Sequence, residues 1–190
     1  TFKAIHLSTK VVSLEDAGES VKVVLRDHDG QESTQSFARV LVSVGRTPNS
    51  DVVGLDKTRV RVIERGFVAV DPQRRTDDPH IYAIGDIAGE PMLAHKASYE
   101  GKVAVEAIAG EPAMFDARAV PAVVFTDPEI AWAGLTETQA TAADMPFEVA
   151  KFPWGASGRA TAMGRNDGLT KMIVSPENKA ILGVGIVGIG

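Results

Sequence analysis

Thr76 to Asp86 is the stretch of this sequence whose residue types and spacing best fit a chemical role. It holds a polar turn, a short apolar run over residues 81–84, and then Gly85 and Asp86. The apolar run predicts a parallel strand of an open α/β sheet, and the carboxyl ends of such strands face the ligand crevice. There a glycine lets the backbone approach a ligand, and a carboxylate accepts hydrogen bonds from sugar or ribityl hydroxyls. The stretch therefore predicts a nucleotide-cofactor site, although Gly-Asp alone would equally suit a plain loop after a buried strand.

A second candidate site follows the apolar run Val40–Val44. An almost unbroken apolar run predicts a strand that is buried on both faces. The run ends at Gly45 and Arg46, which is another place where the backbone could approach a ligand. On the sequence alone, an ordinary strand and turn explains these residues at least as well.

Residue patterns also predict the elements that position the first site. Residues 59–63 and 67–71 predict a hairpin around the turn Glu64-Arg65-Gly66. Further upstream, β-branched residues predict two strands, Thr9–Glu15 and Ser20–Arg26. Asp27-His28-Asp29-Gly30 predicts a turn after the second strand.

A helix is predicted from about Met92 to Ala109, because Gly110 follows in the position that favours a left-handed cap. Its free N–H groups and positive dipole end would lie just after Asp86. Small and apolar residues recur along one face at three- and four-residue spacing, namely Ala97, Gly101, Ala104 and Ile108. This face predicts close packing against a sheet or a cofactor, and a tightly packed core helix explains it fully.

The chain after Phe115 has the pattern of an α+β domain. Thr136 and Gln139 form a capping box, which predicts a short helix. The predicted strands are Val120–Thr126, Glu129–Trp132, Phe147–Phe152, Leu169–Val174 and Ala180–Val187.

Three patterns that resemble functional sites are better explained as structure. Gly183–Gly188 spells the dinucleotide fingerprint Gly-x-Gly-x-x-Gly, but no helix can follow it, so we expect glycines in a packed strand. Asp127-Pro128-Glu129 predicts a turn with solvated charges rather than an acid/base pair. The four histidines lack the close spacing of metal ligands, so neither a metal site nor a catalytic residue is predicted.

Composition excludes several function classes. The 190 residues are 44% hydrophobic and 24% charged, which is typical of a globular chain. A net charge of -5 without a dense Lys/Arg cluster argues against nucleic-acid and membrane surfaces. The longest apolar run, residues 180–190, is too short for a bilayer, which needs roughly 20 residues. Because there are no cysteines, disulfides, thiolate metal sites and cysteine nucleophiles are excluded.

Thr76 together with Ala83-Ile84-Gly85-Asp86 resembles the second FAD-binding motif of the flavin-dependent pyridine-nucleotide disulfide oxidoreductases. The run Met-Leu-Ala-His-Lys-Ala over residues 92–97 is similar to the dihydrolipoamide dehydrogenases of that family, whereas glutathione and mercuric reductases usually differ there. The resemblance covers essentially all of the chain and continues through residues 44–49, 125–132 and 152–160.

The resemblance implies a mixed α/β and α+β fold, with a partial FAD/NAD(P)-binding Rossmann-like domain followed by a truncated α+β dimerisation domain. Residues 1–46 would end the NAD-binding domain, residues 47–115 would form the central FAD-contacting segment, and residues 116–190 would begin the interface domain. The implied FAD contacts are Gly85, Asp86, Met92, Leu93 and Ala94. The implied NAD contacts are Val11, Ser43, Val44, Gly45 and Arg46.

The parent reaction implied by the resemblance is the oxidation of dihydrolipoamide by an active-site disulfide and FAD, with reduction of NAD⁺ to NADH. The disulfide and the His-Glu acid/base pair of the family would lie outside this chain, so the isolated chain is predicted to be inactive. The implied partners are a second copy, bound through residues 116–190, and lipoyl-carrying components of 2-oxo acid dehydrogenase complexes in the cytoplasm. Both ends of the chain indicate cuts through a longer protein.

Two alternatives stay open at this point. The chain could be a non-catalytic dimerisation or interaction module, in which case the purified protein would be colourless. It could instead come from a related disulfide reductase of the glutathione or mercuric reductase type, although residues 92–97 argue against that substrate class.

Overall fold

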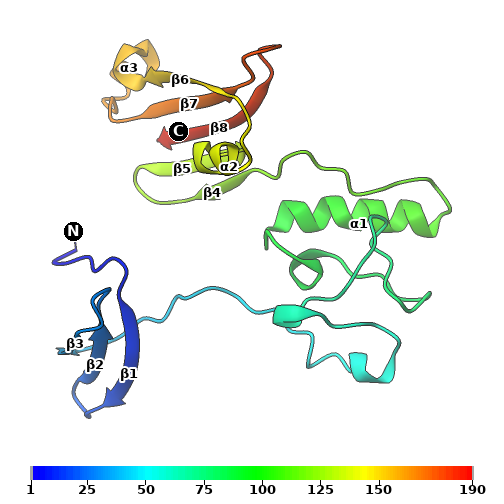
Figure 1. The fold of residues 1–190 in the computed structure, drawn as a ribbon, viewed down its shortest axis with the longest axis horizontal. Coiled ribbons are helices and arrows are strands. Elements are labelled where there is room, and N and C mark those ends of the chain that lie inside the picture. Colours follow the sequence, from blue (N-terminus) through cyan, green and yellow to red (C-terminus); the bar gives the residue numbers. More distant parts are fainter. Residues whose placement is uncertain (1, 190) are drawn as a thin grey trace. The chain divides into compact units, whose positions relative to one another are not determined.

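The structure is a computed structural model that describes residues 2–189, and the chain divides into two compact units after Arg46 (Figure 1). The first unit is a small antiparallel sheet. The second unit contains a long helix and a larger antiparallel sheet. This mixture of helices and sheets agrees with the predicted mixed α/β and α+β class.

The first unit is a three-stranded antiparallel meander with the order β1-β2-β3. Its strands are β1 (Lys10–Asp16), β2 (Val21–Arg26) and β3 (Glu32–Phe37). Asp27 closes the β2–β3 turn, because its carboxylate accepts hydrogen bonds from the N–H groups of Asp29 at 3.0 Å and Gln31 at 2.9 Å. The two predicted strands and this turn are confirmed. Sequence patterns miss β3 because Glu-Ser-Thr-Gln-Ser-Phe is polar and has no apolar alternation.

The buried strand predicted over Val40–Val44 is wrong. Residues 40–50 have no regular secondary structure, and Val44 is 92% exposed. A strand is stable only when a neighbour pairs with its N–H and C=O groups, and no strand of the described residues pairs with this run. All described strand pairs in this unit are antiparallel.

Residues 59–71 form the predicted hairpin at the start of the second unit. The N–H of Ile63 donates to the carbonyl of Phe67 at 2.7 Å across the turn η2 (Glu64–Gly66). Arg65 in this turn has a left-handed φ of 62°. The hairpin packs on a small core of buried and half-buried side chains that also includes the segment before Asp86: Val60, Val68, Ala83, Leu55, Val70, Ile81, Ile87 and Ala88.

The predicted helix is present as α1 (Ala94–Ile108), and it begins two residues later than expected. Gly110 has a φ of +88°, and its N–H donates to the carbonyl of Ala107 at 3.1 Å, which confirms the predicted left-handed cap. The predicted packing face is confirmed in part. Gly101 lies against Ile84, whereas Ile108 is 63% exposed.

The rest of the second unit is a five-stranded antiparallel sheet with the order β4-β5-β8-β7-β6. Its strands match the predicted ones within a few residues: β4 (Ala122–Val124), β5 (Glu129–Gly134), β6 (Glu148–Pro153), β7 (Leu169–Val174) and β8 (Ile181–Gly188). The helix α2 (Glu137–Ala142) starts with the predicted capping box, in which the N–H of Gln139 donates to the Thr136 hydroxyl at 3.2 Å. The short helix α3 (Gly158–Ala162) was not expected from the sequence.

The Gly183–Gly188 pattern lies inside β8, which confirms that it is not a phosphate-binding loop. β8 pairs with β5 on one side and with β7 on the other. A Cβ atom at Gly183 would overlap the backbone of Leu135, so this glycine is required for close packing. Asp127 and Pro128 form the predicted turn before β5, where the exposed Asp127 carboxylate accepts a 2.6 Å hydrogen bond from Arg165.

Candidate functional site

Thr76 closes the turn that precedes the candidate site. Its hydroxyl donates to the carbonyl of Ile81 at 2.7 Å and accepts from the N–H of Asp78 at 3.2 Å. The Thr76 N–H also donates to the carbonyl of Ile81, at 3.2 Å. These bonds bring residues 74–76 alongside residues 81–83 and explain why the sequence pattern needs Thr76 at this distance from Gly85 and Asp86.

The parallel strand predicted over residues 81–84 is absent. This segment makes an isolated antiparallel bridge between Tyr82 and Arg75, and the N–H of Ala83 donates to the carbonyl of Arg74 at 3.1 Å. The described residues supply no neighbouring parallel strand, so the apolar run stays extended without forming a regular strand.

Gly85 and Asp86 open the short 3-10 helix η3 (Gly85–Ala88) directly after this segment. Gly85 is buried and has a left-handed φ of +76°, whereas Asp86 is exposed. A Cβ atom at Gly85 would lie 3.1 Å from the Cβ of Ala97 on α1, so only glycine lets the chain pass this close to the helix.

The start of α1 is the second part of the candidate site. Leu93 is the N-cap residue and supplies no side-chain hydrogen bond to the helix. The first N–H groups of any α-helix have no acceptor within the helix, and they carry about half a positive charge. Ala94 is exposed here, whereas Met92 and Leu93 are half-buried.

Side chains of α1 contact the backbone of Gly85 directly. The Gly85 N–H donates to Glu100 Oε2 at 2.6 Å, and Lys96 Nζ donates to the carbonyl of Gly85 at 3.2 Å. The structure therefore brings Gly85, Asp86 and the first turns of α1 together, as the site requires. Lys96 and Glu100 were not predicted as site residues, although their four-residue spacing continues the buried stripe of Val103 and Ala107.

The residues expected to contact NAD belong to two different elements of the first unit. Val11 lies on β1, whereas Ser43, Val44, Gly45 and Arg46 follow one another in the irregular segment after β3. Gly45 has a φ of +118° and open space where a Cβ atom would lie. None of the cavities described below is lined by these residues.

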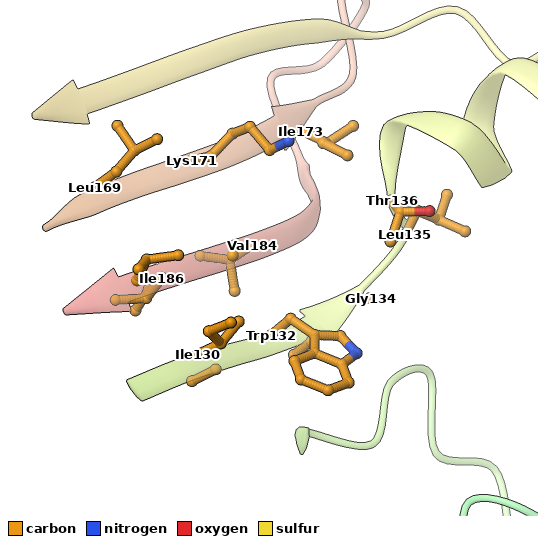
Figure 2. Close-up of a pocket in the computed structure, with 14 residues that line it drawn as sticks. Ile130, Trp132, Gly134, Leu135, Thr136, Leu169, Lys171, Ile173, Val184 and Ile186 are labelled. Carbon is orange, nitrogen blue, oxygen red and sulfur yellow. The ribbon is translucent and has the colours of Figure 1, made fainter. Parts of the chain in front are cut away.

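The five-stranded sheet carries an apolar cavity of about 290 Å³ (Figure 2). Its lining comes from β5, β7, β8 and the start of α2, and includes Ile130, Trp132, Leu135, Leu169, Ile173, Val184 and Ile186. A second cavity of about 270 Å³ contains His95 together with Pro121, and His95 Nε2 lies 2.7 Å from the carbonyl oxygen of Pro121. His95 thus connects α1 to the segment that leads into β4.

Asp78, in the turn before Gly85, and Glu137, on α2, have shifted pKa values. The N–H groups of His80 and Arg59 donate to the Asp78 carboxylate at 3.2 and 3.3 Å, and these hydrogen bonds lower the pKa of Asp78. On α2, the hydrogen bond from the Lys171 ammonium lowers the pKa of Glu137. Both carboxyl groups are therefore held in the charged form over a wider pH range than in the unfolded chain.

Comparison with known protein families identifies the chain. A family model described as pyridine nucleotide-disulphide oxidoreductase matches residues 4–101, and the model for the dimerisation domain of the same family matches residues 120–190. The chain belongs to the pyridine nucleotide-disulphide oxidoreductase family. The first matched region contains Gly85, Asp86 and the start of α1, and the second contains the five-stranded sheet.

Curated relatives of this disulphide oxidoreductase chain are named dihydrolipoyl dehydrogenase. The protein of Vibrio parahaemolyticus is 44% identical over 184 residues, which cover 97% of this chain and 39% of the relative. The Bacillus subtilis protein is 45% identical over the same shares. The Geobacillus stearothermophilus protein is 48% identical over 165 residues, or 87% of this chain and 35% of the relative. The chain thus spans well under half the length of these relatives.

Solved structures of longer proteins have the same fold. The Mycobacterium tuberculosis protein LpdA superimposes with a TM-score of 0.82 at 27% identity, over 95% of this chain and 39% of that chain. The flavoprotein disulfide reductase RclA from Escherichia coli gives a TM-score of 0.82 at 24% identity, over 95% of this chain and 41% of that chain, which supports the fold alone.

Two features are absent from the part of the chain that the structure describes. No helix within residues 2–189 is long and apolar enough to cross a membrane. The same residues contain no group of three or more His, Asp or Glu side chains that could hold a metal ion.

Proposed function

We propose that this chain is part of a dihydrolipoyl dehydrogenase, an enzyme that oxidises protein-bound dihydrolipoamide and reduces NAD⁺. The observation that carries the proposal is the identity of 44% to 45% with proteins of that name across 97% of the chain. The run at residues 92–97, which contains Lys96, supports this substrate class over glutathione or mercuric ion.

The residues of the candidate site fit a bound FAD. Gly85 lets the backbone pass close to α1, the exposed Asp86 carboxylate offers acceptors for ribityl hydroxyls, and the uncapped start of α1 offers N–H donors near Ala94. The half-buried Met92 and Leu93 would line the approach to these donors. FAD, when bound, supplies the electron transfer between a disulfide and the pyridine nucleotide.

This chain contributes binding and electrostatics to the reaction. Asp86 holds the cofactor by accepting hydrogen bonds, and the positive end of α1 stabilises negative charge that develops near Ala94. The chain has no cysteine and therefore supplies no redox disulfide. For this reason we propose that the isolated chain is inactive.

The proposal divides the chain into three parts. Residues 1–46 form the C-terminal part of an NAD-binding domain, and residues 47–115 form the FAD-contacting segment. Residues 116–190 form part of an interface domain, through which two copies make the homodimer. In the first part, residues 43–46 would lie close to the pyridine nucleotide, and Val11 on β1 would be a further contact. The positive φ of Gly45 supports this close approach of the backbone.

The proposed partners are lipoyl-carrying components of a 2-oxo acid dehydrogenase complex, and the proposed location is the cytoplasm. Cell fractionation with co-purification of lipoylated proteins tests both statements. Recovery in a fraction without lipoylated proteins would contradict them.

The activity is tested with a full-length protein that contains this chain. NADH formation from NAD⁺ is measured with dihydrolipoamide, and NADPH- or NADH-dependent reduction of glutathione disulfide and of mercuric ion serves as the comparison. We expect turnover with dihydrolipoamide and none with the other two. A colourless protein without bound flavin would instead support a non-catalytic association module, for which the apolar sheet cavity around Trp132 is the relevant surface.

A further inference from the structure

We infer that Lys96 and Glu100 are positioning residues that hold the backbone of Gly85 and thereby fix the direction of the Asp86 carboxylate. This inference rests on the proposed binding of FAD. It concerns two buried side chains and gives them a role beyond helix packing.

Lys96 and Glu100 are charged residues in one of the most buried places of the described structure. They are one helical turn apart on α1, and their side chains are 2% and 1% exposed. Lys96 Nζ lies 3.0 Å from Glu100 Oε1. Arg74 Nη1 donates to the same oxygen at 3.1 Å, so two cations share one carboxylate.

The remaining hydrogen bonds of this pair go to the backbone of Gly85. Glu100 Oε2 accepts from the Gly85 N–H at 2.6 Å, and Lys96 Nζ donates to the Gly85 carbonyl at 3.2 Å. The Gly85 carbonyl belongs to the peptide group that leads into Asp86. Holding this carbonyl therefore limits the rotation that would swing the Asp86 side chain away from the start of α1.

The ion pair by itself gives no reason to keep this arrangement. Removing charges from water is costly, and replacing a buried ion pair by apolar side chains of similar size is often neutral or stabilising. An apolar pair at these two positions would, however, leave the N–H and C=O groups of Gly85 buried without partners. The charged pair satisfies both groups and defines one orientation of them.

The left-handed turn at Gly85 makes the contact possible. Its φ of +76° turns the N–H and the carbonyl toward α1, and the missing side chain allows the approach to Ala97. The Arg74 guanidinium lies 4.7 Å from the centre of the Phe115 ring. The backbone carbonyl of Arg74 accepts a hydrogen bond from the N–H of Ala83 at 3.1 Å. Arg74 thus connects the segment before Gly85 to the same carboxylate.

The test uses a full-length flavoprotein that contains this chain, with the variants Lys96→Met, Glu100→Gln and Glu100→Leu. The matched control is the pair Lys102 and Glu106, whose side chains are 69% and 41% exposed and which has the same residue types and spacing on the same helix. For each variant, FAD is titrated into apoprotein to give Kd, the visible circular dichroism of the bound flavin is recorded, and the thermal midpoint is measured.

Lys96→Met and Glu100→Leu are expected to raise the Kd for FAD roughly tenfold or more, because each removes a charge-assisted hydrogen bond to Gly85. Both should also change the visible circular dichroism of the flavin. Glu100→Gln keeps an acceptor for the Gly85 N–H and should recover most of the affinity lost in Glu100→Leu. Lys102→Met and Glu106→Leu should leave Kd and spectrum unchanged.

A purely structural role for the pair predicts a different pattern. The thermal midpoint would fall while the Kd and the flavin spectrum of folded variants stayed at their wild-type values, and that result overturns the inference. If Glu100→Leu does not fold, Lys96→Met decides, since it leaves Glu100 paired with Arg74. Wild-type protein that binds no FAD would refute the proposed function, and the inference with it.

Discussion

Lys171 on β7 donates a 2.7 Å hydrogen bond to the Glu137 carboxylate on α2, and Lys171 is one of the residues that line the apolar cavity of the sheet (Figure 2). This bond, together with the capping box at Thr136, attaches the short helix α2 to the sheet. The same bond lowers the pKa of Glu137, so the attachment depends on pH.

The first prediction is a loss of stability in acid through Glu137. Because its pKa is lower in the folded chain, the stabilisation is fully present above the unfolded pKa, about 4.3, and is lost as the pH falls through the folded pKa. Glu137→Gln should flatten this part of a plot of melting temperature against pH. Glu177→Gln, which removes an exposed carboxylate in the β7–β8 turn, serves as the control. An equal pH dependence in both variants contradicts the assignment.

Asp86 gives the second prediction, for a full-length flavoprotein that contains this chain. Asp86→Ala removes an acceptor for ribityl hydroxyls and should weaken FAD binding by roughly 1–3 kcal/mol, and Asp86→Asn should weaken it less. Asp77→Ala removes an exposed carboxylate in the same stretch and is the control. The fraction of apoprotein after dialysis measures the effect. Equal fractions for wild type and Asp86→Ala would rule out this role for Asp86.

Glycines of β8 supply the third prediction. A Cβ atom added at Gly183 would overlap the Leu135 backbone, whereas a Cβ atom added at Gly185 would lie in open space. Gly183→Ala should therefore destabilise the protein by roughly 1–3 kcal/mol, as overpacking does, and Gly185→Ala should be close to neutral. Urea unfolding of the two variants measures the difference. A neutral Gly183→Ala would show that β8 can shift away from Leu135.

Sequence patterns predicted most of the antiparallel strands, because these strands are rich in apolar and β-branched residues and turn residues separate them, whereas the polar strand β3 was missed. Leu169–Val174 was located to the residue, and the Thr136 capping box was identified from two side chains. The strands predicted over Val40–Val44 and over residues 81–84 were wrong, because an apolar run in a sequence does not show whether a partner strand lies beside it.

The candidate site was predicted in part. Gly85, Asp86 and the start of α1 lie together because they are close in sequence and a turn at Thr76 orients them. The contact of Lys96 and Glu100 with Gly85 was not predicted, since charged residues on a helix usually face solvent. Only the tertiary structure shows that this pair faces inward.

The fourth prediction is that the isolated chain has no dihydrolipoamide dehydrogenase activity. A dithiol substrate must exchange with a protein disulfide, and this chain contains no cysteine. NADH formation from NAD⁺ and dihydrolipoamide should therefore match the enzyme-free rate. Lipoamide-dependent NADH production above that rate would refute the prediction.

The final prediction is that the isolated chain associates with itself through its five-stranded sheet. Ile130 and Trp132 on β5 remain 43% and 40% exposed, and they lie on the apolar cavity of about 290 Å³. β4 and β6 are the edge strands, so unpaired N–H and C=O groups are also available to another chain. An exposed apolar face next to open edges promotes association in water.

Sedimentation velocity over a concentration series tests this prediction at low and moderate salt. Apolar association should persist at moderate salt, because salt screens charges and leaves apolar contacts intact. Ile130→Lys should shift the chain toward monomer, whereas Val105→Lys changes an exposed apolar residue of α1 outside the sheet and should not. A strictly monomeric wild type at every concentration would contradict the prediction and would show that the apolar face around Trp132 does not bind a second copy.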